Sequence, residues 1–317
     1  MRETTLFTID TPYRSALPVR AWRFGPEEKK DLAVMGALRG NEIQQMYICG
    51  RLIRALEAAE AAGQLEDSCG ILVVPCANQF SMNVGRRFWA ADNTDINRMF
   101  PGYDQGETTQ RIAARLFEVL QQYPYGVHLT SFHLPGDHLP HVRMMDTGYQ
   151  RLEEAAGFGL PYVVLRSPQA YDTTTLNYNW QIWNTQAFSL YSTSTDCIDE
   201  EAATLAVESI LRFLAVKGHL HRTYLPATVA PHIFRESSLK TLLTHAGGLL
   251  LCRRKPGDAV SAGELLGEIL DPCSCKVLEQ IKTDCDGRVF FGHRSQLING
   301  HEVAFRILPL ALEEGGV

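Results

Sequence analysis

The stretch Leu32-Ala-Val-Met-Gly-Ala-Leu38 is followed directly by Arg39-Gly-Asn-Glu42. A short, uninterrupted apolar run of this kind is typical of a strand that is buried on both faces. Gly63 stands where a following helix would end, and the apolar residues before it keep helical spacing: Ile43, Met46, Tyr47, Gly50, Ile53 and Leu56. The segment therefore predicts a strand, a polar turn and a helix, which together are a unit of an α/β fold.

The same alternation continues along the chain as far as residue 216. Apolar runs predict strands at 70–75, 125–132, 162–165 and 188–192, and amphipathic segments predict helices at 108–122, 149–156 and 199–216. We expect a mixed α/β sheet with helices on both faces. In such sheets, ligands gather in the loops at the carboxyl ends of the strands.

After about residue 222 the sequence pattern changes. It now predicts short strands separated by glycine turns, with a faint internal repeat. This pattern resembles a lipoyl-type barrel of two interlocked halves. We therefore expect two domains, an α/β domain at 1–222 of the catalytic type and a small all-β, lipoyl-like barrel at 223–317. We expect the barrel to be a structural module.

Composition narrows the class of protein. The 317 residues include 30 Lys and Arg against 36 Asp and Glu, a net charge of −6, without the basic block that follows a phosphate backbone. Nucleic acid is therefore not an expected partner. No run reaches the length of a membrane span, and the eight scattered cysteines do not form a disulfide framework. We expect a cytoplasmic protein, with a homodimer as the default oligomer.

Polar residues cluster in two loops, at 39–42 and at 92–102. In the second loop Asn97 stands next to Arg98. A guanidinium can bind a carboxylate with two hydrogen bonds while an amide fixes its orientation, so this pair suits recognition of an acidic ligand. A loop held by its own Asx turns explains the same residues equally well.

The order of strand, x-G-N-E, amphipathic helix, apolar strand and D-I-N-R-M-F-P-G at 95–102 resembles the succinylglutamate desuccinylase and aspartoacylase family, in the zinc carboxypeptidase clan. The resemblance covers most of the chain. It implies a zinc-carboxypeptidase-like α/β fold and hydrolysis of an N-acyl amino acid or similar small amide. It also implies that Asn97 and Arg98 hold the substrate carboxylate.

The zinc ligands depart from the family pattern. The family has His at the position of Arg39, a Glu at Glu42 and a second His in Asp-Leu-His on a later strand. Arginine is permanently cationic and cannot ligate a metal. The later strand aligns in two registers, one of which makes His128 the ligand, whereas the other puts His128 in place of the Asp and loses the ligand. The flanking residues favour the second of these. The remaining candidate zinc ligands are Glu42 and His128.

The family's catalytic Glu is missing as well. The corresponding stretch at 188–197 contains no Glu, and Tyr191 or Ser192 occupies its place. A hydroxyl is a poor base at neutral pH without an activating partner. The identity of any general base is therefore left open.

Two further groups of residues bear on the site. His133, His138 and His141 follow His128 closely and offer another metal set, although surface or hydrogen-bonded histidines are the better interpretation. Arg143 resembles a residue at the family's substrate entrance. Arg143, Arg86 and Arg87 are each explained as well by solvated surface charges. With Arg39 and Arg98 they predict a cationic cleft that attracts a small anionic or acyl amino acid ligand.

Three functions remain as hypotheses. The first is a metal-dependent hydrolase of the desuccinylase and aspartoacylase type that cleaves N-acyl amino acids. The second is a non-hydrolytic carboxylate-binding or regulatory protein on the same fold. The third is metal-independent chemistry on an anion at Arg39. Convergence of three ligand atoms near Glu42 distinguishes the first from the other two.

Overall fold

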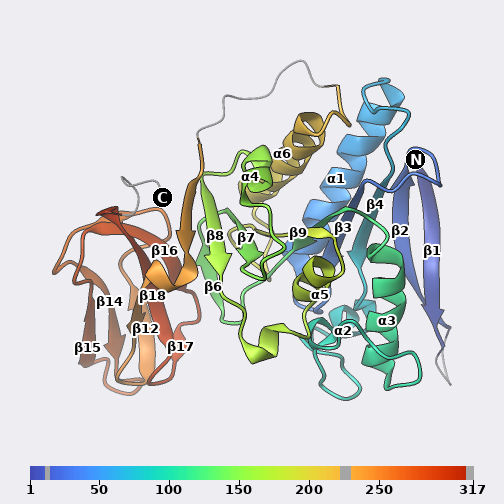
Figure 1. Cartoon of the computed structure of the whole chain (residues 1–317). Coiled ribbons are helices and arrows are strands. Elements are labelled where there is room, and N and C mark those ends of the chain that lie inside the picture. Colours follow the sequence, from blue (N-terminus) through green and yellow to red (C-terminus); the bar gives the residue numbers. More distant parts are fainter. Residues whose placement is uncertain (11–14, 222–229, 312–317) are drawn as a thin grey trace.

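The computed structural model describes residues 1–10, 15–221 and 230–311. A nine-stranded mixed sheet forms its larger part, with the strand order β1-β2-β4-β3-β5-β9-β7-β8-β10 (Figure 1). The strands are β1 (Arg2–Ile9), β2 (Leu17–Phe24), β3 (Leu32–Ala37), β4 (Ile71–Cys76), β5 (Tyr125–Leu129), β7 (His141–Met145), β8 (Tyr162–Arg166), β9 (Gln186–Tyr191) and β10 (His232–Arg235).

Strand direction reverses three times across this sheet, between β1 and β2, between β2 and β4, and between β9 and β7. The central strands β4, β3, β5 and β9 are parallel, while β7 runs antiparallel to β9 and parallel to β8. At the far edge β1 and β2 form an antiparallel pair next to β4. The predicted mixed α/β sheet is therefore confirmed, and β1, β2 and β7 are strands that the apolar-run pattern did not predict.

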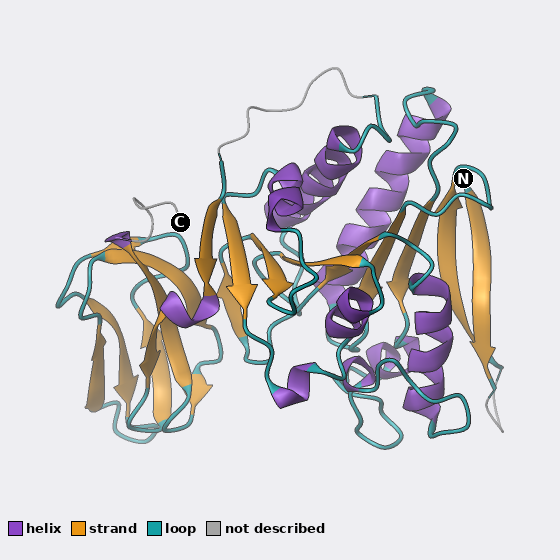
Figure 2. Ribbon diagram, in the orientation of Figure 1, coloured by secondary structure: helices purple, strands orange, loops and turns teal. Residues whose placement is uncertain are grey.

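Helices cover both faces of the sheet (Figure 2). Helices α1 (Ile43–Ala61) and α6 (Glu200–Val216) pack on one face, and α3 (Thr108–Leu120) and α5 (Leu176–Ile182) pack on the other. A capping box between Glu107 and Gln110 begins α3, and the Asp199 side chain accepts from the Ala202 N–H to begin α6. The short helices are α2 (Gln79–Asn83) and α4 (Leu152–Ala155). Within the described residues, no helix is long and apolar enough to cross a membrane.

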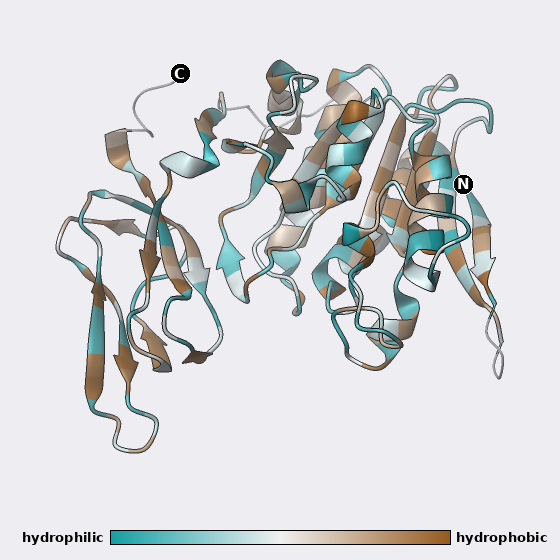
Figure 3. Ribbon diagram, turned by 60° about the horizontal axis from the view of Figure 1, so that its bottom comes forward, coloured by the Kyte–Doolittle hydropathy of each residue, from teal (hydrophilic) through white to brown (hydrophobic). Residues whose placement is uncertain are grey.

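Strand β3 lies at the centre of the buried core. All six of its residues are buried, because helices cover both of its faces. Figure 3 shows the central strands mainly in the colours of apolar residues, while the helices carry apolar and polar residues on different sides. The apolar run that opens the sequence is thus the central strand that carries Arg39 to its carboxyl end.

The C-terminal part is all β. Its strands are β11 (Lys240–Leu243), β12 (Gly248–Cys252), β13 (Ala259–Val260), β14 (Leu265–Leu270), β15 (Val277–Lys282), β16 (Gly287–His293), β17 (Leu297–Ile298) and β18 (Val303–Pro309), arranged in two sheets. The interlocked, lipoyl-like arrangement of these strands stays a prediction.

The two parts share strands across the predicted boundary. The short strand β6 (Gly136–His138) lies in the α/β part of the sequence but pairs with β16 of the C-terminal part. Conversely, β10 follows residue 222 yet pairs with β8 of the large sheet. The predicted boundary itself lies at residues 222 and 223, outside the described residues, and the division into two domains stays a prediction.

Candidate functional site: an arginine-lined cavity

A cavity of about 210 Å³ lies on the face of the large sheet that carries α3 and α5. Because side chains alternate along a strand, His128 of β5, Ser189 of β9 and Arg143 of β7 share this face. Ser189 pairs with His128 on one side and with Arg143 on the other, so the three side chains form a row. The remaining wall comes from loops and neighbouring strands: Arg39, Asn97, Arg98, Thr130, Ser131, Phe132, His133, Met145, Arg166, Tyr171, Asp172, Thr175, Asn177 and Tyr191.

Arg39 lies between two carboxylates. Its Nη1 donates to Glu42 Oε1 at 3.1 Å, and its Nε and Nη2 donate to Asp95 Oδ2 at 3.0 and 2.8 Å. The side chains of Arg39 and Glu42 are only 6% and 0% exposed. Burial lowers the pKa of the guanidinium, but the charges and hydrogen bonds of Glu42 and Asp95 outweigh it and raise that pKa. Arg39 is therefore a permanent cation inside the protein.

The Glu42 carboxylate is fully occupied by protein donors. Its Oε2 accepts from the backbone N–H of Leu38 at 2.8 Å and of Arg39 at 2.9 Å, and its Oε1 also accepts from Ser131 Oγ. The turn can take this shape because Gly40 presses against the 81–86 loop, where a Cβ would lie 2.2 Å from the carbonyl oxygen of Arg86. The R-G-N-E turn is thus built around Glu42.

The D-I-N-R motif forms part of the cavity wall. Asp95 Oδ1 accepts from the Asn97 N–H at 3.0 Å and starts the 3-10 helix Ile96–Arg98. Asn97 Oδ1 accepts from the Leu176 N–H at 3.1 Å. Arg98 donates to the carbonyl oxygen of Tyr171 and is 33% exposed. Asn97 and Arg98 line the cavity, as the sequence predicts, and their contact with a ligand stays a prediction.

Arg143 differs from the other cavity arginines because it makes no direct salt bridge with an acidic residue. Among the described residues it makes no salt bridge, its Nε is buried without a hydrogen bond, and its guanidinium lies 4.7 Å from the centre of the Tyr191 ring. Arg166, by contrast, pairs with Asp172 at 3.1 Å and with Glu236 at 2.7 Å. Arg143 therefore lines the cavity without a direct ion pair, although its charge helps to lower the pKa of Glu236.

His128 is buried in the cavity wall as a neutral group. Burial, together with the positive charges of Arg39 and Arg143, lowers its pKa to about 3. Its Nε2 makes no hydrogen bond with the described residues. Burial and nearby arginines likewise lower the pKa of His133, which also lines the cavity, to about 4. The cationic character of the cavity at neutral pH comes from arginine alone.

Tyr191 is a neutral hydroxyl in the cavity wall. It stacks on His141 with ring centres 4.6 Å apart, and burial raises its pKa. The Ser192 hydroxyl instead donates to the carbonyl oxygen of Ser194 at 3.4 Å. Neither residue has a partner that would make it a base, so the general base remains unassigned.

The other predicted histidines form a separate aromatic cluster. His138 and His141 pack with Phe132, Tyr191 and Phe291. His141 Nδ1 contacts the Leu139 carbonyl oxygen at 2.8 Å, and burial lowers its pKa to about 4. These rings are buried packing elements rather than surface histidines.

The residues at Glu42 do not fit a zinc ion. Its carboxylate faces the guanidinium of Arg39, and the residue of the β5 end that reaches it is Ser131. Among the residues that the structure describes, no group of three His, Cys, Asp or Glu donors within 4.8 Å of one another includes Glu42 or His128. A zinc site normally has three or four such ligands.

Several cavity residues were not singled out from the sequence. Asp95 lay within the recognised motif but was not identified as the partner of Arg39. Ser131, Arg166, Asn177 and Ser189 carry no local signal, since their position depends on strand pairing and on the alternation of side chains.

A comparison with known protein families finds a match that covers most of the α/β part. Residues 28–214 match the Succinylglutamate desuccinylase/Aspartoacylase catalytic domain. The chain belongs to this family. The resemblance carried by the D-I-N-R-M-F-P-G motif is therefore confirmed.

Individual relatives in the desuccinylase and aspartoacylase family are distant. The N-alpha-acetyl-L-2,4-diaminobutyric acid deacetylase of Halomonas elongata is 27% identical over 251 residues, which are 74% of this chain and 69% of that protein. The product-bound ectoine utilization protein EutE (DoeB) from Ruegeria pomeroyi has a TM-score of 0.80 at 16% identity, covering 96% of this chain and 94% of that one. A succinylglutamate desuccinylase/aspartoacylase from Rhodobacter sphaeroides has a TM-score of 0.74 at 18% identity, covering 92% and 89%. At these identities the solved structures support the fold.

Proposed function

We propose that this member of the family binds an N-acyl amino acid, or a similar small carboxylate, in the arginine-lined cavity without a zinc ion at Glu42. The observation that carries the proposal is the guanidinium of Arg143, which lines the cavity without a direct ion pair and has a buried Nε without a hydrogen bond. An anionic ligand could form charge-assisted hydrogen bonds with this half-buried guanidinium.

The charge balance of the cavity supports an anionic ligand. Four arginines and one acidic residue line it. Glu42 and Asp95 compensate Arg39, whereas Asp172 and Glu236 compensate Arg166. Arg98 lies 3.7 Å from the same Asp172, which leaves Arg98 and Arg143 with spare capacity for a carboxylate.

The arrangement at Glu42 favours binding over zinc-assisted hydrolysis. A zinc-bound water needs a metal with an open coordination position. Here the guanidinium of Arg39 and the hydroxyl of Ser131 take the contacts that such a metal would make with Glu42. A ligand in this cavity would meet fixed positive charge and neutral hydroxyl and imidazole groups.

The second candidate is a deacylase of N-acyl amino acids. The family match and the deacetylase of Halomonas elongata support it. In that case the water must be activated by a route that does not involve a metal at Glu42. The cavity hydroxyl of Ser131 donates to the Glu42 carboxylate, which is already engaged by the guanidinium of Arg39.

One experiment separates the two candidates. N-acetyl and N-succinyl amino acids would be titrated into the purified protein by calorimetry, and the same mixtures would be analysed for free amino acid by mass spectrometry. Binding without product supports the proposed function. Release of amino acid by wild type supports the deacylase and overturns the claim of binding without turnover. Absence of binding across the series overturns both.

A further inference from the structure

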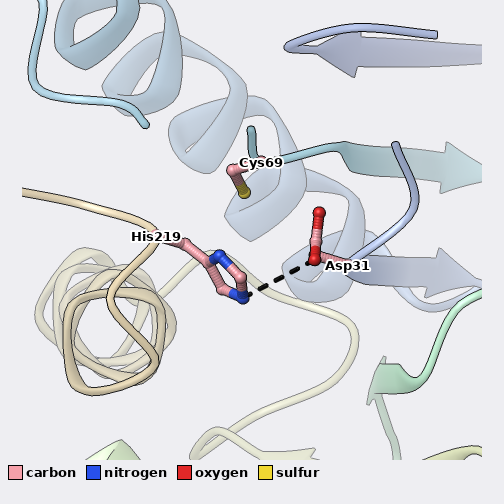
Figure 4. Close-up of side chains that lie close together, drawn as sticks. All are labelled: Asp31, Cys69 and His219. Atoms are coloured by element: carbon pink, nitrogen blue, oxygen red, sulfur yellow. Dashed lines mark ion pairs between the residues drawn. The ribbon is translucent and has the colours of Figure 1, made fainter. Parts of the chain in front are cut away.

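Three side chains of metal-ligating type converge at the end of the sheet opposite the cavity (Figure 4). Asp31 directly precedes β3, Cys69 stands two residues before β4, and His219 follows α6. One donor atom from each lies within 4.8 Å of the other two. The six residues of β3 separate Asp31 from the region of Arg39 by about 20 Å.

Backbone contacts hold these three segments together. The Gly70 N–H donates to Asp31 Oδ2 at 2.7 Å, and the Asp31 N–H donates to the Gly70 carbonyl oxygen at 2.8 Å. A Cβ on Gly70 would lie 1.9 Å from the Lys29 carbonyl oxygen, so only glycine allows this approach. On the other side, the Glu66 N–H donates to the His219 carbonyl oxygen at 3.0 Å. The side chains are therefore brought together by the fold itself.

The donor atoms are a thiol sulfur, an imidazole nitrogen and a carboxylate oxygen. This mixed set suits Zn²⁺ and related borderline ions, whereas Ca²⁺ and Mg²⁺ prefer oxygen ligands throughout. Tetrahedral zinc with normal bond lengths puts such donors about 3.5 Å apart. The Asp31 Oδ1 to His219 Nε2 distance is 3.9 Å, which is close to that value.

We propose that Asp31, Cys69 and His219 form a transition-metal site, with zinc as the preferred ion, that fastens the end of α6 to the starts of β3 and β4. The side chains of Asp31 and His219 are 26% and 21% exposed, so an ion can reach the donors from solvent. Binding replaces the proton of the Cys69 thiol with the metal and releases that proton to water. The proposal does not depend on the function of the cavity.

Two other interpretations of the cluster are weaker. As a nucleophile Cys69 is unsuitable, because its side chain is fully buried, and burial and the charges of Asp31 and Glu66 raise its pKa to about 12. As a plain core thiol it would resemble Cys49, which is also fully buried but belongs to no such group of donors among the described residues. The convergence of imidazole and carboxylate on Cys69 is what sets it apart.

The test uses the full chain, freed of metal with a chelator and then titrated with Zn²⁺ or with Co²⁺. We expect about one ion per chain and, with Co²⁺, a thiolate-to-metal charge-transfer band. Cys69→Ala should abolish that band, and both Cys69→Ala and His219→Gln should weaken binding by about tenfold or more, the loss caused by removing even a supporting group. His219 is partly exposed, so its variant serves if Cys69→Ala fails to fold.

Two controls make the result specific. Cys49→Ala removes a buried thiol outside the cluster and should leave metal binding and the band unchanged. Glu42→Gln should also leave them unchanged, because Glu42 lies at the other end of β3. If wild type binds no metal, or if Cys69→Ala and His219→Gln bind as tightly as wild type, the proposal is wrong. Loss of the metal in Glu42→Gln would place the metal at Glu42, and would contradict both this proposal and the zinc-free site at Glu42. If the protein binds no carboxylate but still binds the metal through Cys69 and His219, only the proposed function of the cavity is wrong.

Discussion

The two ends of β3 carry two polar clusters, one buried and one partly exposed, whose charges are arranged differently. At the carboxyl end, the guanidinium of Arg39 bridges the carboxylates of Glu42 and Asp95. At the amino end, the carboxylate of Asp31 faces a thiol and an imidazole, and its only ion pair among the described residues is the 3.9 Å contact with His219. The cluster at the carboxyl end contains its own permanent cation, whereas the cluster at the amino end consists of side chains that can ligate a metal ion.

The comparison shows that a carboxylate at the position of a family's metal ligand, such as Glu42, is not sufficient for a metal site. Both carboxylates are held by backbone N–H groups, Glu42 through Leu38 and Arg39 and Asp31 through Gly70. What differs is the side chain opposite the carboxylate. A guanidinium satisfies the carboxylate with charge and hydrogen bonds, whereas an imidazole and a thiol offer lone pairs to an external cation.

The largest expected effect concerns the internal cation. Arg39→Ala leaves two buried carboxylates without a counter-charge, and we expect the free energy of unfolding to fall by about 3–5 kcal/mol. Urea denaturation measures this. Arg20→Ala is the control, because Arg20 is 55% exposed and pairs with Glu3 at the surface, where a pair contributes about 0–1 kcal/mol. Equal losses in the two variants would show that Arg39 does not act as the internal cation.

The next effect concerns ligand binding at the carboxyl end. If Arg98 holds a ligand carboxylate, Arg98→Ala should weaken the binding of an acidic ligand by about 2–5 kcal/mol, because a charged partner is left unpaired. Calorimetry measures the change, and Arg111→Ala removes an exposed arginine outside the cavity as a control. Unchanged affinity in Arg98→Ala would exclude this residue from the binding site.

The third prediction concerns Arg143, which lines the cavity without forming a salt bridge with another described residue. Arg143→Ala should reduce ligand affinity by about 1.5–3 kcal/mol, the contribution of a hydrogen bond to a charged group. It should change the free energy of unfolding by less than about 1 kcal/mol, because it removes the contact with Tyr191 and an attraction to Glu236 but no direct ion pair. Arg143→Lys keeps the charge and should lose less affinity. A large loss of stability in Arg143→Ala would mean that the protein itself supplies a partner.

The smallest effect is on the pH dependence of stability. The pKa of His128 is about 3 in the folded protein, against about 6.5 in the unfolded chain, so the unfolded state binds the proton first. The stabilisation is complete above about pH 6.5 and is lost as the pH falls toward 3. Between pH 7 and 5, wild type should lose about 2 kcal/mol more than His128→Gln. His245→Gln, at a side chain that is 85% exposed, should follow wild type. Identical pH profiles for wild type and His128→Gln would contradict a buried neutral His128.

The elements that the sequence predicts correctly are those whose structure is determined by residues close together in the chain. The apolar run of β3 and the helical spacing of α1 depend only on neighbours in the chain, and both are confirmed. The edge strands β1 and β2 are partly exposed and lack long apolar runs, so periodicity did not reveal them. The predicted helix at 149–156 shortens to α4, Leu152–Ala155, followed by a 3-10 turn at Ala156–Phe158.

The candidate site depends more strongly on long-range contacts. Of the arginines predicted to form a cationic cleft, Arg39, Arg98 and Arg143 line the cavity, whereas Arg86 and Arg87 are not among its lining residues. The pair of Arg39 with Asp95 joins residues 56 positions apart, which no local pattern indicates. His138 and His141 were expected to be surface or hydrogen-bonded histidines. His141 is hydrogen-bonded to the Leu139 carbonyl oxygen, but both rings are buried by Phe290 and Phe291 of the C-terminal part, which neighbouring residues do not indicate.

The pairing of β6 with β16 also bears on how the protein is made. Phe132 and His133 of the cavity wall directly precede the segment that leads into β6, and β6 finds its partner only in residues 287–293. Glu236, which anchors Arg166, and Arg306, which anchors Glu236, arrive late as well. A chain growing from its N-terminus therefore cannot complete this wall until residue 306 has left the ribosome. The wall is completed well after the D-I-N-R motif has been synthesised, and a chain terminated before β16 would carry that motif without the finished site.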